Sequence, residues 1–314
     1  MRAVAALRAV KVRAPAKINL HLAVGATRPD GFHQLATLYQ AVDLYDTVHA
    51  RRDGSGAVTV TVADAAGDPV LGVPSDGSNL CVRAALLLRA HTGLTTTGVA
   101  LHVLKRIPVA GGLAGGSADA AATLLACDAL WRTGLDLEAL LGLARRLGSD
   151  VPFALVGGTC TGTGRGELVT AQPAGPRLTW VAATSSRGLS TPRCYAELDR
   201  LRGRERARVA ELPTALLDAL RGDGAGLVDA LLTTARNDLT PAAMALRPGL
   251  GELVRAGAQA GARLAMLAGS GPTVLFLGAD RSHASRLAAQ LLGRIDVDGV
   301  HLLTGPVPGA QRVG

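Results

Sequence analysis

A glycine-rich stretch between a predicted strand and a predicted helix constrains this chain more than any other feature. Residues 108–118 contain four glycines and three alanines. They follow residues 99–104, whose alternating apolar side chains predict a strand, and precede an alanine-rich helix over 117–132. Small side chains let backbone N–H groups approach an anion closely, and the start of a helix favours negative charge. The stretch predicts a phosphate-binding loop, with a plain tight turn as the alternative.

The spacing within this stretch excludes two common phosphate-binding motifs. No Gly-Lys-Ser/Thr follows the glycines, so the stretch is not a Walker A loop, and the G-x-G-x-x-G spacing of a dinucleotide fingerprint is absent. Ser117 can either cap the predicted helix or offer its hydroxyl to a phosphate or to Mg²⁺. The motif indicates an anion site and leaves the ligand open.

Strand and helix patterns are mixed in both halves of the chain. Its 314 residues fit two lobes, with a boundary near 171–176 that divides 1–172 from 173–314. This mixture predicts an α+β fold with a cleft between the lobes. We expect Asn79 to cap one helix and Gly148 to be the C′ glycine of another. Further predicted elements are strands over 57–62, 178–184, 262–267 and 273–277, helices over 79–91 and 136–147, and a turn or hairpin over 157–167.

Composition excludes several classes of protein. Hydrophobic residues make up 48% and charged residues 18%, which provides a core and excludes a disordered chain. No stretch approaches the ~18 apolar residues of a membrane span. The apolar first ten residues are too short and too charged for a secretory signal. The 4 cysteines are widely spaced and form no zinc or disulfide motif, so the expected compartment is the cytoplasm.

The net charge of +8 invites comparison with nucleic-acid-binding proteins. The arginines are scattered except between Arg200 and Arg208, and that run is accompanied by Asp199 and Glu205 and has no aromatic residue that could stack on a base. A solvated helix face or a loop explains the run. We therefore expect an anionic small molecule, not a nucleic acid, as the partner.

Lys17 and Asp150 are the candidate chemical pair. In a strand over 17–22, Lys17, Asn19 and His21 share one face, although an edge strand with a solvated face is the alternative. Asp150 can cap the short helix that follows it, or its carboxylate can lie beside Lys17. A carboxylate next to an ammonium stays ionised and can accept a proton from a hydroxyl.

Two shorter segments complete the set of motifs. Phe32 and His33 follow a turn and can stack on and hydrogen-bond a base, or Phe32 can lie in the core behind a hairpin. The turn at 269–273, Gly-Ser-Gly-Pro-Thr, can be a turn only, or it can close over a phosphate held by the first loop.

These motifs, in this order, closely resemble those of the 4-diphosphocytidyl-2-C-methyl-D-erythritol kinases, within the superfamily of galactokinase, homoserine kinase, mevalonate kinase and phosphomevalonate kinase. The resemblance rests on Pro-Ala-Lys17-Ile-Asn, Asp-Gly-Phe-His33, the loop at 108–118, Gly-Ser-Asp150-Val-Pro and the turn ending at Thr273. It implies an N-terminal lobe like ribosomal protein S5 domain 2, a ferredoxin-like C-terminal lobe and an active site in the cleft.

The resemblance also implies roles for individual residues. Lys17 and Asp150 would be the catalytic pair, and ATP and Mg²⁺ the cofactors, with the metal ligands unassigned. Phe32 and His33 would recognise the cytidine, although the family commonly has Tyr where this chain has Phe32. The residues implied for ATP are Pro108, Val109, Ala110, Gly111, Gly112, Leu113, Ala114, Gly115, Gly116, Ser117, Ala118, Asn79 and Lys105. Those implied for the substrate also include Asn19, Thr191, Pro192, Tyr195, Gly269, Ser270 and Gly271.

The implied reaction transfers the γ-phosphoryl group of ATP to the 2-hydroxyl of 4-CDP-2-C-methyl-D-erythritol, in the non-mevalonate isoprenoid route. Two alternatives stay open. One is another small-alcohol kinase of the superfamily, of the homoserine or mevalonate type. The other is a non-catalytic protein that binds a nucleotide or RNA. We expect a monomer or weak homodimer without a membrane partner.

Overall fold

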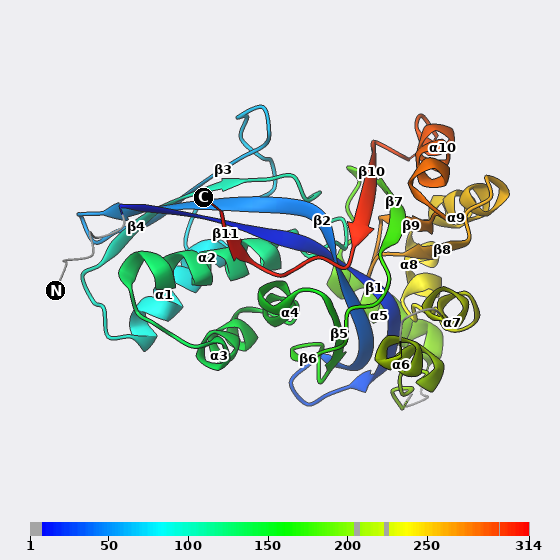
Figure 1. Ribbon diagram of the computed structural model, residues 1–314, viewed down its shortest axis with the longest axis horizontal. Coiled ribbons are helices and arrows are strands. Elements are labelled where there is room, and N and C mark those ends of the chain that lie inside the picture. Colours follow the sequence, from blue (N-terminus) through cyan, green and yellow to red (C-terminus); the bar gives the residue numbers. More distant parts are fainter. Residues whose placement is uncertain (1–7, 204–207, 223–225, 295, 314) are drawn as a thin grey trace.

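Two β-sheets, each with its own helices, make up the protein (Figure 1). The computed structural model describes residues 8–203, 208–222, 226–294 and 296–313. The strands are β1 (Ala9–Thr27), β2 (His33–Asp53), β3 (Val58–Ala63), β4 (Gly98–Leu104), β5 (Thr159–Thr163), β6 (Leu168–Ala171), β7 (Leu178–Thr184), β8 (Leu264–Leu267), β9 (Val274–Leu277), β10 (Gly299–Gly305) and β11 (Gln311–Arg312). The helices are α1 (Leu80–His91), α2 (Gly115–Trp131), α3 (Leu137–Leu147), α4 (Val151–Val156), α5 (Thr191–Arg202), α6 (Thr214–Arg221), α7 (Leu227–Thr234), α8 (Thr240–Leu246), α9 (Gly249–Gln259) and α10 (Arg281–Leu291).

The first sheet is organised around a long hairpin of β1 and β2, which crosses most of the molecule (Figure 1). The strand order is β11-β1-β2-β4-β3, and β5 and β6 extend the sheet from β2. Almost every residue in the middle of β1 is buried, and helices α2 and α4 pack against this strand. The register shifts between Asn19 and His21, which marks a β-bulge. This bulge breaks the alternation expected for Lys17, Asn19 and His21.

Helices α1 and α2 pack against the first sheet, with α3 and α4 beside them (Figure 1). β3 and β4 run parallel, and α1 is the crossover between them that parallel strands require. Asn79 caps α1 as predicted, because its Oδ1 accepts a hydrogen bond from Cys81 N at 2.8 Å. The prediction that Gly148 is a C′ glycine is wrong. Gly148 is the C-cap of α3, and its φ of 177° is extended backbone that any residue adopts.

The second sheet has the antiparallel order β10-β7-β9-β8. The chain enters through β7, passes through α5 to α9, returns through β8 and β9, and closes with α10 and β10. This is the β-α-β-β-α-β pattern of a ferredoxin-like lobe, with extra helices in the first crossover. The predicted strands over 178–184, 262–267 and 273–277 are all present, because each is a short apolar run with turn residues beside it.

The α+β class with two lobes is thus confirmed. The division at 172–173 stays a prediction, and β11 returns from the end of the chain to pair with β1 in the first sheet. Arg204 and Arg206 of the arginine-rich run lie outside the described residues. No helix in the described part of the chain is both long and apolar enough to cross a membrane.

Candidate active site

A cavity of about 680 Å³ lies where loops and helix ends of the two lobes meet. Its wall includes parts of β1 and β2, the loop before α2, the start of α5 and the turn between β8 and β9. All the residues predicted for a site line it except Asn79, Leu113, Ser117, Ala118 and Gly271. The fold therefore brings nearly the whole predicted set to one place.

Three of these five residues, Leu113, Ala118 and Asn79, are kept from the cavity wall for structural reasons. Leu113 and Ala118 are fully buried under the loop. Asn79, predicted for ATP, does not line this cavity: its Oδ1 caps α1, and its Nδ2 donates to Pro74 O at 2.6 Å. Pro74 does line the cavity, so Asn79 holds part of the wall in place without reaching it. Ser117 lies in the first turn of α2 but does not cap it.

Lys17 and Asp150 meet in this cavity. Lys17 Nζ lies 3.7 Å from Asp150 Oδ2, and the Lys17 side chain is 9% exposed. The alternative of an edge strand with a solvated face is therefore wrong for Lys17. Asp150 is the N-cap residue of α4, yet its side chain makes no capping hydrogen bond. Its carboxylate, 27% exposed, remains open to a substrate.

Hydrogen bonds fix the position of Lys17. Its Nζ donates to Asn19 Oδ1 at 2.8 Å, and Asn19 Nδ2 donates to Thr37 Oγ1 at 2.8 Å. The bulge turns His21 away, and its Nδ1 contacts Thr234 O at 3.0 Å outside the cavity wall. Burial lowers the pKa of His21, which favours its neutral form. The expected row of ammonium, amide and imidazole is therefore only a Lys17–Asn19 pair.

The loop before α2 is built to present backbone N–H groups. Ala110, Gly112 and Ala114 have φ values of 54°, 79° and 58°, and alternation of left-handed residues along a loop forms an anion-binding concavity. Ala114 is the N-cap of α2 and offers no side-chain cap. The first N–H groups of the helix are therefore free to donate to a ligand. Helix α2 has 17 residues, and its positive end adds to the attraction for an anion.

The second glycine turn touches both the loop and Lys17. A Cβ atom on Gly112 would overlap Ala268 O, and one on Gly269 would lie 3.3 Å from Lys17 Nζ. Ser270 Oγ, in the same turn, is 2.8 Å from Thr191 Oγ1 at the start of α5. Only glycine permits this approach at Gly112, so the two lobes meet around the phosphate loop.

The cavity wall also contains the rings predicted to bind a base, those of Phe32, His33 and Tyr195. Phe32 is 47% exposed, so the alternative that it lies in the core is wrong. The Arg165 guanidinium lies 4.5 Å from the centre of the Phe32 ring. The rings of His33 and Tyr195 are 4.8 Å apart and tilted by 33°. Phe32, from the first lobe, and Tyr195, from the second, therefore line the same cavity, which a planar base can enter.

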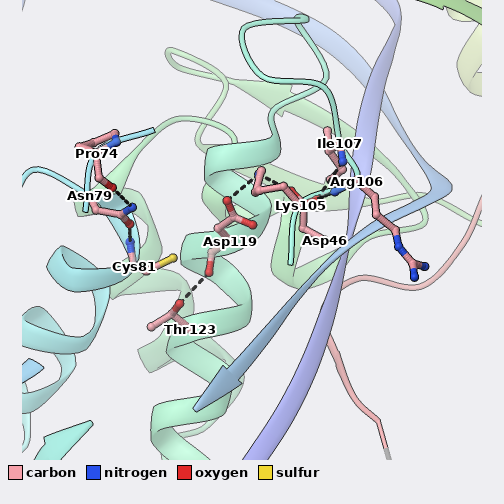
Figure 2. Close-up of polar contacts among 9 residues, drawn as sticks. All are labelled: Asp46, Pro74, Asn79, Cys81, Lys105, Arg106, Ile107, Asp119 and Thr123. Carbon is pink, nitrogen blue, oxygen red and sulfur yellow. Dashed lines mark hydrogen bonds and ion pairs between the residues drawn. The ribbon is translucent and has the colours of Figure 1, made fainter. Parts of the chain in front are cut away.

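A buried charged group lies beside the cavity, and Figure 2 shows its contacts. Lys105 Nζ donates to Asp119 Oδ2 at 2.7 Å and also to Asp46, whose second oxygen accepts from the backbone N–H groups of Arg106 and Ile107. Burial opposes the charge of Lys105, but Asp119 and Asp46 together raise its pKa above the ordinary value. Lys105 lines the cavity, and both carboxylates that its ammonium contacts are buried protein groups.

Asp119 was not predicted from the sequence. Burial raises its pKa to about 8, although Lys105 opposes the shift. Its Oδ1 is buried and has no hydrogen-bond partner among the described residues, and Asp119 lines the cavity. A lone acid in the first turns of an alanine-rich helix was the available signal. Asp46, Arg165 and Asp199 were also missed, since their partners lie far away in the sequence.

Comparison with known proteins agrees with this geometry. The GHMP kinases N terminal domain matches residues 79–158 and the GHMP kinases C terminal matches 215–294. Curated relatives named 4-diphosphocytidyl-2-C-methyl-D-erythritol kinase include one from Salinispora arenicola, 49% identical over 97% of this chain and 94% of the relative. Another, from Thermobifida fusca, is 50% identical over 97% of this chain and 98% of the relative.

Solved structures give the same result. A crystal structure of 4-(cytidine 5'-diphospho)-2C-methyl-D-erythritol kinase, 32% identical, aligns with a TM-score of 0.72 over 94% of this chain and 98% of that one. Homoserine kinase from Cytophaga hutchinsonii, 18% identical, aligns with a TM-score of 0.76 over 100% of both chains and shares the fold. The chain belongs to the 4-diphosphocytidyl-2-C-methyl-D-erythritol kinase family, a branch of the GHMP kinases.

Proposed function

We propose that this kinase transfers the γ-phosphoryl group of ATP to the 2-hydroxyl of 4-CDP-2-C-methyl-D-erythritol, giving the 2-phosphate and ADP in the non-mevalonate isoprenoid route. The observation that carries this proposal is the Lys17–Asp150 pair, 3.7 Å apart beside an open glycine loop. The relatives of about 50% identity, whose names give this activity, support the choice of acceptor.

Asp150 accepts the proton in this mechanism. Its carboxylate faces the cavity and takes the proton of the acceptor hydroxyl. The hydroxyl oxygen then bonds to the γ-phosphorus while the bond to the β-phosphate oxygen breaks and ADP leaves. Lys17, held by Asn19, places its positive charge beside Asp150 and orients the hydroxyl. Phosphoryl transfer depends mostly on this kind of positioning and on neutralising charge.

The loop binds the phosphates. The backbone N–H groups of 110–116 and the start of α2 supply donors and positive potential to the ATP phosphates. These groups are already in place before ATP arrives, because the loop is pinned against Ala268 and by the bond from Lys17 N to Leu113 O at 3.1 Å. A preorganised site spends no free energy on rearrangement during the reaction.

Mg²⁺ fits the polar groups beside the loop. Asp119 Oδ1 is a buried carboxylate oxygen with no partner among the described residues, and carboxylate oxygen is a ligand that Mg²⁺ prefers. Asp119, which lines the cavity, would hold the ion together with the ATP phosphates. The described residues contain no cluster of three or more His, Cys, Asp or Glu suited to a metal. Bound Mg²⁺ would neutralise charge on the phosphate oxygens.

The ring-bearing end of the cavity would recognise the cytosine. Phe32 and Tyr195 provide faces for stacking, and His33 provides a hydrogen-bonding edge. Homoserine and mevalonate have no base that could use this end, so the geometry favours the cytidine substrate over these small alcohols. A non-catalytic nucleotide or RNA site would have no use for the Lys17–Asp150 pair.

Three further expectations accompany this proposal. The two lobes divide near residues 172–173, and the protein acts as a monomer or weak homodimer in the cytoplasm. All 4 cysteines are buried free thiols, which suits a reducing compartment.

A coupled ADP-release assay tests the proposed function. Purified enzyme with ATP and Mg²⁺ should release ADP with 4-CDP-2-C-methyl-D-erythritol and much less with 2-C-methyl-D-erythritol 4-phosphate, which lacks the cytidine. Homoserine and mevalonate serve as competing acceptors. Equal or faster turnover with either competitor would contradict the proposal.

A further inference from the structure

The imidazole of His33 is held from the opposite lobe by a carboxylate that the proposed reaction does not use. His33 Nε2 lies 2.9 Å from Asp199 Oδ1, and the His33 side chain is 7% exposed. Thr27 Oγ1 lies 3.2 Å from the same nitrogen and donates to Asp199 Oδ2 at 3.4 Å. Asp199 Oδ1 therefore contacts the ring directly, while Oδ2 holds Thr27, which contacts the same ring nitrogen.

This contact decides which nitrogen carries the proton. A carboxylate only accepts hydrogen bonds, so Nε2 must be the N–H that donates to Asp199. In a neutral imidazole the other nitrogen, Nδ1, is then an acceptor. Nδ1 has no hydrogen-bond partner among the described residues. It is also not one of the fully buried polar atoms that lack a partner, so it keeps some accessible surface. His33 lines the cavity, and we infer that Nδ1 is the atom that it offers there.

Helix α5 places this carboxylate beside the base. Tyr195 and Asp199 are four residues apart and therefore share one face of α5. Tyr195 stacks near His33 while Asp199 binds its far edge, so one helix face supports both the plane and the protonation of the imidazole. One turn further on, Arg202 anchors the same helix to the first lobe through Val24 O at 2.8 Å.

We propose that Asp199 is a positioning residue that fixes His33 as a hydrogen-bond acceptor and thereby selects cytosine over uracil. This inference rests on the proposed function. Cytosine carries an amino group where uracil carries a carbonyl oxygen. An acceptor at Nδ1 binds the amino group, whereas it meets the lone pairs of the uracil oxygen. A site that leaves a buried polar group unpaired rejects the wrong ligand strongly.

The test compares kcat/KM for 4-CDP-2-C-methyl-D-erythritol and its uridine counterpart. The wild-type enzyme should prefer the cytidine substrate. Asp199→Asn can donate as well as accept, so the preference should fall by about tenfold or more, because the tautomer is no longer fixed. Asp199→Glu, which keeps a carboxylate, should restore much of the preference. Glu197→Gln is the matched control, since Glu197 is on α5, binds Arg200 and does not line the cavity.

Nitrogen NMR of the histidine rings gives a readout independent of turnover. In the wild-type enzyme the His33 spectrum should show a protonated Nε2 and an unprotonated Nδ1, and Asp199→Asn should mix the two tautomers. An unchanged tautomer and an unchanged base preference in a folded Asp199→Asn enzyme would overturn the inference. If wild-type enzyme uses neither nucleotide substrate, the proposed function fails, while the NMR result still decides the role of Asp199.

Discussion

Lys17 Nζ lies 3.7 Å from Asp150 Oδ2, although one residue comes from the first strand and the other from the start of α4. The sequence separates them widely, and the first lobe brings them together beside the phosphate loop. Asn19 restrains the lysine by a hydrogen bond of 2.8 Å, while no cap bond restrains the aspartate. The pair is therefore a fixed cation beside an available base.

Replacing Asp150 by alanine should lower kcat by about 10²–10⁴-fold and leave the KM for ATP nearly unchanged, because a positioned base contributes that much. Steady-state kinetics at saturating ATP measure the effect. Asp136→Ala is the control: Asp136 caps α3 through Ala139 N, so its loss should cost about 1 kcal/mol of stability without changing kcat. Near-normal turnover of Asp150→Ala would refute the role of the base.

Replacing Phe32 by alanine should raise the KM for the cytidine substrate by about 5- to 150-fold, since stacking on a base is worth about 1–3 kcal/mol. Stability should change little, because the ring is 47% exposed. Leu137→Ala, at a residue that is 55% exposed and does not line the cavity, should change neither quantity. An unchanged KM in both Phe32→Ala and Tyr195→Ala would exclude base stacking.

Replacing Gly112 by alanine should raise the KM for ATP at least about tenfold, because the methyl group would push the loop away from Ala268 and disturb its N–H groups. Gly134→Ala is a matched control. Gly134 also has a positive φ, 66°, but a Cβ atom there meets nothing within 4 Å. The control should show only a backbone cost of about 1 kcal/mol in thermal unfolding. Normal ATP binding by Gly112→Ala would contradict the packing argument.

Replacing Lys105 by methionine should destabilise the fold by about 3–5 kcal/mol at neutral pH, because it leaves buried Asp46 and Asp119 without their cation. Urea unfolding measures the loss. The pKa of Asp119 is already raised to about 8 by burial, so the folded chain holds a proton that the unfolded chain releases near 3.8. The variant should therefore be more stable at pH 6 than at pH 8. The opposite order would contradict the assignment of the buried acid.

The local sequence of this protein determined several of its elements and some of their ends. The alternation over 57–62 and the cap at Asn79 require only neighbouring residues, and both are present in β3 and α1. The glycines and alanines of 108–118 likewise determined an open loop before a helix, because positive φ and small side chains are local properties. The strands over 178–184, 262–267 and 273–277 in the second lobe follow from the same patterns, whereas β10 was not predicted.

The tertiary structure alone decided which side chains meet. The bulge after Asn19 turned His21 out of the cavity, because pairing with β2 sets that register. Asp46 and Asp119 surround Lys105, and Asp199 reaches His33, only because the sheet and α5 place distant segments side by side. Burial then altered the protonation of these groups. Contact and burial depend on the packed chain as a whole, so no local pattern encodes them.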